Sequence, residues 1–211
     1  AIAPTLAPAT VPAPAAAQAE APAQTQTQTQ SPVQPAVLAS TPYFRGSSEF
    51  ERHYAVGDLH AYQVIDRFNR SAKTLERRVS AVDVANDRVE FDGGQHVTDL
   101  MGNSLRNDRG EFDMPRQFYP AELTVGRKWR TRFKQSRANG DVFTFDYELR
   151  IAARERITVP AGSFDAYRIE ARGFNVELGA LIVRTIWVAP GISADVAHET
   201  EVRLRSGVVE Q

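Results

Sequence analysis

Residues 142–151 read VFTFDYELRI, and after Val142 the apolar and polar side chains alternate with a period of two. The apolar members, Phe143 to Ile151, would share one face of an extended strand, and the polar members, Thr144 to Arg150, the other. One buried face and one solvated face are typical of a strand in an antiparallel sheet. The stretch therefore predicts an all-β fold.

The same pattern extends on both sides of this stretch. It recurs at 129–134 and 196–205, and further strands are expected at 60–68, 88–92, 97–101, 157–159, 164–172 and 181–189. Turn residues separate these segments: Asn86-Asp87, Asp92-Gly93-Gly94, Asn139-Gly140-Asp141, Pro160-Ala161-Gly162 and Pro190-Gly191. Residues 71–84 leave two alternatives open, because Leu75, Val79 and Val82 would also suit one face of a helix.

An internal repeat favours a strand for that segment. Val56-Gly57 precedes the sequence RVEFDGG at 88–94, and Val125-Gly126 precedes RITVPAG at 156–162 with nearly the same spacing. Aligning the two copies places residues 75–84 opposite 143–151. We therefore predict an antiparallel meander built from two related halves, about 54–116 and 117–205, which forms a curved sheet or a half-open barrel.

The first 42 residues differ in composition from the rest of the chain. They hold eight of the twelve prolines, no glycine and a single charged residue, Glu20. Such a segment offers too little apolar surface to offset the entropy cost of ordering. We predict a disordered Ala/Pro/Gln-rich tether over 1–42 and a single β domain over 43–211. Long tethers of this kind favour the periplasm or cell envelope of a Gram-negative bacterium, with any export signal upstream of Ala1.

Composition also excludes several classes of function. The chain has 25 basic and 26 acidic side chains, so no nucleic-acid partner is expected. No apolar run reaches the length of about 20 residues that a membrane-spanning helix needs. Cysteine is absent, which removes disulfides, thiolate metal sites and a cysteine nucleophile. No cofactor motif is present, and the four histidines lack the spacing of a metal site.

Two motifs in the second half carry a resemblance to a known family. Residues 157–169 read ITVPAGSFDAYRI, and residues 186–191 read IWVAPG. Together with Phe118-Tyr119-Pro120 and Val125-Gly126, they resemble a family of exported bacterial domains of unknown function that share a VPAG-F-A-I segment and a later W-APG turn. The resemblance covers about 125–205. It implies an envelope location and a β-rich fold similar to the lipoprotein carriers of the outer membrane, and it brings no catalytic residues.

The candidate binding residues follow from the alternation. His198 shares a strand face with Val196 and Val202, where a polar group could orient a ligand in an apolar cavity or simply be a hydrogen-bonded core residue. An aromatic inner face would line that cavity; its members are Trp129, Phe133, Phe143, Phe145 and Tyr147. A basic strip would lie on the opposite face, where it could attract an anionic partner or oppose edge pairing; its members are Arg130, Arg132 and Lys134.

No catalytic residues are predicted. The serines that follow Gly46 and Gly162 lack the second glycine of a nucleophile elbow. We therefore expect a non-enzymatic binding module that holds a lipid-like or other apolar small molecule within a curved sheet. The alternative is a structural or scaffolding envelope protein that acts through surface contacts with a protein partner. A cavity in the sheet would favour the first.

Overall fold

The computed structural model describes residues 47–204 and 209–210. The predicted tether, residues 1–42, lies outside the described residues. Within them the protein is all-β, with one short 3₁₀ turn, η1 (Asp92–Gly94), and no α-helix. A small sheet pairs β1 (Ser47–Glu49) with β8 (Glu122–Thr124).

All other strands belong to one antiparallel sheet of 12 strands in the order β14-β13-β12-β11-β10-β9-β7-β6-β5-β4-β3-β2. The first half of the sheet contains β2 (Leu59–Asp66), β3 (Ser71–Asp83), β4 (Arg88–Phe91), β5 (His96–Thr98), β6 (Ser104–Asn107) and β7 (Gly110–Phe112). The second half contains β9 (Lys128–Ser136), β10 (Val142–Val159), β11 (Gly162–Asn175), β12 (Ala180–Val188), β13 (Ala197–Arg203) and β14 (Val209–Glu210).

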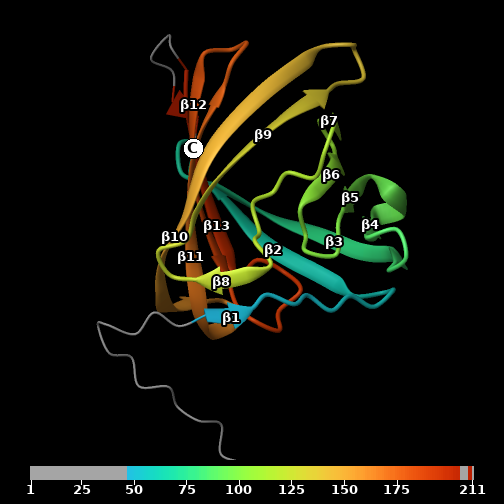
Figure 1. Ribbon diagram of the computed structural model, residues 1–211, viewed down its shortest axis with the longest axis vertical. Helices are drawn as coiled ribbons and strands as arrows, with labels where there is room; N and C mark the ends of the chain where they lie inside the picture. The colour runs from blue at the N-terminus through green and yellow to red at the C-terminus, as the bar shows by residue number, and fades with distance from the viewer. Residues whose placement is uncertain (1–46, 205–208, 211) are drawn as a thin grey trace, which may run out of the picture. The chain divides into compact units, whose positions relative to one another are not determined.

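The sheet is an open, curved meander, as predicted. Its edge strands β2 and β14 do not pair, so the sheet does not close by backbone hydrogen bonds. Figure 1 shows the long strands β9 to β13 bending as one wall, with β2 and β3 crossing the domain beside them. An exposed ion pair of 2.5 Å between Arg67, after β2, and Glu199 of β13 joins the two ends of the sheet.

The two halves repeat the same backbone pattern at their first hairpins. In the first half, Gly57 N donates to Val79 O (2.8 Å) and Val79 N donates to Asp58 O (2.9 Å). In the second half, Gly126 N donates to Ile151 O (2.8 Å) and Ile151 N donates to Arg127 O (3.0 Å). The strand register shifts just after Val79 and again just after Ile151. Both glycines have positive φ, 99° and 93°, a conformation that favours glycine at these turns.

Several strand bounds differ from the sequence predictions. Residues 71–83 form a strand, which confirms the choice made from the repeat. Residues 157–159 do not form a strand of their own, because the bulge after Ile151 lets β10 continue to Val159. The strand predicted at 97–101 ends at Thr98, where Asp99 begins a turn whose carbonyl accepts Gly102 N (3.0 Å).

The core lies on the concave face of β9 to β12. Tyr147, Leu149 and Ile151 of β10 are buried there, while Glu148 and Arg150 are exposed on the other face. Thr144 departs from the predicted pattern, since it is only 9 % exposed although it belongs to the polar face. The turn after β11 explains this, because a Glu177 carboxylate oxygen accepts the Thr144 amide at 2.6 Å and brings the turn against it.

Candidate functional site

The predicted aromatic face is packed by the protein's own side chains. Phe133 and Tyr147 are 3 % and 1 % exposed, and Phe145 stacks on Phe133 with ring centres 5.4 Å apart. Phe118, which was not among the predicted residues, packs edge-on against Tyr147 at 4.9 Å. Phe143 is also buried, beneath the guanidinium of Arg137 at 4.2 Å. These four predicted residues therefore act as core in this structure.

Phe118 belongs to an extended segment, residues 113–121, which connects β7 to β8. Asn103 fixes this segment: its Oδ1 accepts the backbone amides of Phe118 (2.8 Å) and Tyr119 (2.9 Å). Asp99 in turn holds Asn103, with Oδ1 accepting its backbone amide (2.7 Å) and Oδ2 its side-chain amide (2.9 Å). Burial raises the pKa of Asp99, although these hydrogen bonds oppose the rise. The buried Asn103 thus helps to fix the backbone course of 113–121, together with the backbone hydrogen bond from Arg116 N to Ser104 O (3.1 Å).

A hollow of about 410 Å³ lies beside this segment. Trp129, Tyr119, Pro115 and Pro120 give it apolar walls, and its polar lining includes Asp99 and Arg127. Trp129 is the one residue of the predicted aromatic set that lines it. The indole Nε1 donates to the carbonyl of Gln117 at 2.7 Å, which fixes the orientation of the ring. The hollow therefore combines a fixed aromatic wall with carboxylate and guanidinium groups.

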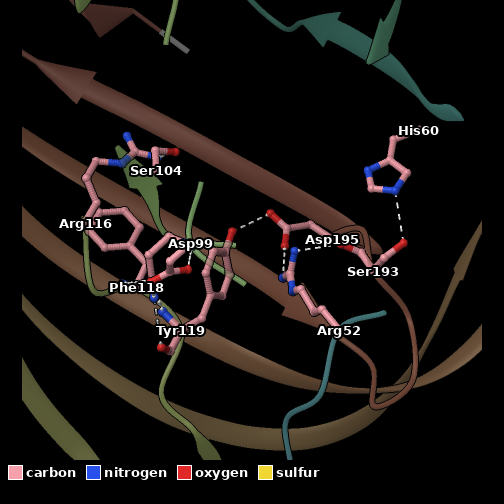
Figure 2. Close-up of polar contacts among 10 residues, drawn as sticks. Arg52, His60, Asp99, Ser104, Arg116, Phe118, Tyr119, Ser193 and Asp195 are labelled. Carbon is pink, nitrogen blue, oxygen red and sulfur yellow. Dashed lines mark hydrogen bonds and ion pairs between the residues drawn. The ribbon is translucent and has the colours of Figure 1, made fainter. Parts of the chain in front are cut away.

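On the other side of Tyr119, the carboxylate of Asp195 joins three parts of the chain. Its Oδ2 accepts the Tyr119 hydroxyl and its Oδ1 accepts Arg52 Nη2, each at 2.7 Å. Figure 2 shows this network, with Arg52 also donating to the carbonyl of Ser193 (3.0 Å). Burial alone would lower the pKa of Arg52, but attraction to Asp195 and the tyrosines outweighs it and raises the pKa. Arg52 is therefore charged and paired.

A serine and a histidine meet next to this network, which the sequence did not predict. Ser193 Oγ lies 3.0 Å from His60 Nε2, and the two residues are 133 positions apart in the chain. Burial and the nearby charge of Arg52 lower the pKa of His60. Both carboxylate oxygens of Asp195 are engaged by Tyr119 and Arg52, and no other carboxylate is hydrogen-bonded to His60 within the described ranges. Among these residues, the pair therefore has no third group of the kind that orients a catalytic imidazole.

His198 lies on the concave face of β13, as predicted, opposite Ile186 of β12. Its side chain is exposed, yet burial lowers its pKa, and the charges of Arg184 and Arg116 lower it further against the opposing effect of Asp195. His198 is not among the residues that line the 410 Å³ hollow, so the structure does not bring it together with Trp129.

The predicted basic strip is exposed on β9, but acidic side chains lie beside it. Arg130 makes a double hydrogen bond to Asp146 of β10, at 2.7 and 2.6 Å. Arg132 and Asp146 are paired across the two strands in register, and so are Arg130 and Glu148. Lys134 lies opposite Thr144 instead. Cross-strand acids thus offset much of the positive charge of the strip.

Comparison of the chain with protein-family models, curated proteins and solved structures found no match. The resemblance of residues 125–205 to the exported-domain family therefore stays a prediction. No helix in the described part of the chain is long and apolar enough to cross a membrane. The same residues contain no cluster of three or more histidine or acidic side chains that could hold a metal ion.

Proposed function

We propose that this protein is a non-enzymatic binding module for a small, largely apolar ligand, and that the ligand occupies the hollow beside Trp129. The observation that carries the proposal is the hollow itself. Its volume of about 410 Å³ falls in the range of about 300–1,000 Å³ typical of small-molecule sites. Trp129 and Tyr119 supply apolar contact area, and the neighbouring polar groups would fix the orientation of one polar end.

The lining favours a ligand with an apolar body over a fully charged one. Two prolines and two aromatic rings form much of the wall, and rigid side chains of this kind lose little conformational entropy when a ligand binds. The acidic residues Asp87 and Asp99 and the basic residue Arg127 also line the hollow. A lipid-like molecule with a neutral polar end would satisfy both features.

Intrinsic fluorescence tests this proposal, because the chain has two tryptophans. Trp129 lines the hollow, whereas Trp187 of β12 donates to Glu155 Oε1 (2.8 Å) and is not among the residues that line it. In Trp187→Phe protein, titration with the apolar probe N-phenylnaphthylamine should quench Trp129 saturably, and a bacterial lipid extract should compete. In the matched Trp129→Phe variant no saturable quenching is expected. Equal quenching in both variants, or none in either, would overturn the proposal.

The proposal that the protein is not an enzyme has its own test at Ser193. His60 lies within hydrogen-bond distance of Ser193 Oγ, but no carboxylate among the described residues orients its ring. Without that partner the serine is a weak nucleophile. A fluorophosphonate probe should therefore leave Ser193 unlabelled, as judged by intact-mass measurement. Stoichiometric labelling that His60→Ala abolishes would show an activated serine.

One observation favours the scaffolding alternative, namely the dense packing of Phe118 on Tyr147 and Phe133. A filled core leaves surface contacts as the remaining route to function. The two candidates differ in the fluorescence experiment, where a scaffold shows no saturable response. For either candidate, the composition of residues 1–42 supports a periplasmic or envelope location, which fractionation of the cells that make the protein would test.

A further inference from the structure

Two arginines on the concave face have no acidic partner in the part of the chain that the structure describes. Along the extended segment that connects β7 to β8, Pro115, Gln117 and Tyr119 line the hollow, whereas Arg116 is not among its lining residues. Arg116 instead lies between two aromatic rings, with its guanidinium carbon 5.1 Å from the centres of both Phe112 and Phe118. Its Nη2 donates to Ser104 Oγ at 3.2 Å, as Figure 2 shows. Its Nε is buried without a hydrogen-bond partner.

Arg184 approaches the same ring from β12. It lies between Ile182 and Ile186 in the alternation of that strand, so it shares their face, and its guanidinium carbon is 5.8 Å from the Phe118 ring centre. Its Nε is also buried and unpartnered. The register partner of Arg184 is Thr200 of β13, whose hydroxyl is a third buried polar atom without a partner.

The charges around these side chains do not balance. Neither arginine has a carboxylate oxygen within 4.0 Å among the described residues. The nearby carboxylate, Asp195, is already paired with Arg52. The acidic residues of β13 do not neutralise the two arginines, because Glu199 pairs with Arg67 and Glu201 pairs with Arg203.

The lowered pKa values of two residues in this region also indicate an excess of positive charge. Burial lowers the pKa of Arg116 to about 10, and repulsion by Arg184 contributes to the shift. Burial lowers the pKa of the neighbouring His96 to about 4, with further lowering by Arg77 and Arg116. Cations that repel one another and keep a buried N–H donor without an acceptor are costly in a protein interior, whereas an anion would remove both costs.

We propose that Arg116 and Arg184 form an oxyanion-binding site on the concave face, with Thr200 as a further hydrogen-bond donor and His198 at its edge. The ligand class is a phosphate group. Guanidinium groups recognise such groups with charge-assisted hydrogen bonds, and the unpartnered Nε atoms are the donors that such bonds require. The site does not share its arginines with the hollow beside Trp129, so either can fail without the other.

The phosphate could be a free ion or the head group of an amphiphile. The apolar side chains of Ile182 and Val202, which are register partners on the same face, would contact an alkyl chain. Two probes separate these sources: inorganic phosphate and decyl phosphate, each titrated by calorimetry into full-length protein at constant ionic strength. Tighter binding of decyl phosphate by more than about tenfold would identify a head group; equal affinity would identify a free ion.

Variants locate the site. Arg184→Gln should weaken binding of both probes by more than about tenfold, the loss expected when one charged hydrogen bond is removed. Arg172→Gln is the matched control, because Arg172 is exposed on the neighbouring strand β11, and it should bind like the wild type. Binding by neither probe, or equal losses in the two variants, would overturn the proposal.

Thermal unfolding without phosphate separates a binding role from a structural one. If Arg184 is an uncompensated cation, Arg184→Gln should unfold at the same or a higher temperature than the wild type. If Arg184 mainly stabilises the domain through the Phe118 ring, the variant should unfold at a lower temperature, which would contradict the proposal.

Discussion

Gly173 is the position at which the packing of the core can be tested most sharply. It lies on β11, directly opposite Tyr147 of β10 in the register. A Cβ added at Gly173 would lie 2.1 Å from Cδ1 and 2.2 Å from Cε1 of the Tyr147 ring. Ordinary carbon contacts are about 3.5–4.0 Å, so Gly173→Ala requires the ring to move by more than about 1 Å.

The ring has little room to move. Tyr147 is 1 % exposed, Phe118 packs edge-on against it at 4.9 Å, and Phe133 lies at 6.0 Å. Overpacking of a closed core costs about 1–3 kcal/mol, occasionally more. We expect Gly173→Ala to cost about 3 kcal/mol, at the upper end, because the overlap involves a rigid ring on a mid-sheet strand.

A double-mutant cycle in urea, followed by far-ultraviolet circular dichroism, isolates this contact. Tyr147→Ala alone should cost about 3–5 kcal/mol from the lost ring. With the ring gone, Gly173→Ala should cost almost nothing more, which gives a coupling free energy of about 3 kcal/mol. Arg172→Ala, on the opposite face of β11, is the control and should change stability by less than about 0.5 kcal/mol. Additive effects, or a silent Gly173→Ala, would refute this account of the core.

Other parts of the domain can be tested in the same way. The pKa of His96 is lowered from 6.5 to about 4 by burial and by the charges of Arg77 and Arg116, so the unfolded chain takes up its proton first as the pH falls. The stability that neutral His96 contributes should therefore be lost between pH 6.5 and 4, by at most about 3 kcal/mol; urea melts of His96→Gln across this range should show a smaller loss than the wild type. Asn103→Ala leaves the amides of Phe118 and Tyr119 without their acceptor and should cost about 2–3 kcal/mol in the same assay, whereas the exposed Asn139→Ala should be almost neutral. Deletion of residues 1–40 should leave the melting temperature unchanged, because this segment has no periodic apolar face; a fall of several degrees would mean that it packs on the domain.

The sequence predicted the regular part of the fold because that part obeys a local rule. Alternation with a period of two placed Phe143, Tyr147 and Ile151 on the buried face of β10, and all three are buried. The repeat decided between strand and helix for residues 71–83, and the hydrogen bonds at Gly57 and Gly126 show why the two halves match. Short strands such as β6 and β7 were missed, since three or four residues are too few to show a period.

The candidate sites depended on contacts that no local rule contains. The Tyr119–Asp195 and His60–Ser193 contacts join positions 76 and 133 residues apart. One signal was available for Arg184, because a charged residue between Ile182 and Ile186 interrupts an apolar face. Such an interruption marks a buried charge that needs a partner, and the sequence alone could have directed attention to β12 on this ground.

The most informative part of the chain is the segment in which the repeat breaks. Residues 113–121 connect the two halves, lack alternation, and are held by Asn103 and a few isolated backbone hydrogen bonds rather than by a strand ladder. Phe118 of this segment fills the space over Tyr147 that the aromatic stripe would otherwise have offered to a ligand. Its neighbours then divide the remaining surface: Tyr119 lines the hollow beside Trp129, and Arg116 and Arg184 both lie against the Phe118 ring. The repeated strands thus provide a rigid curved support, while the non-repeating connection decides where a ligand could bind and which charge it would meet.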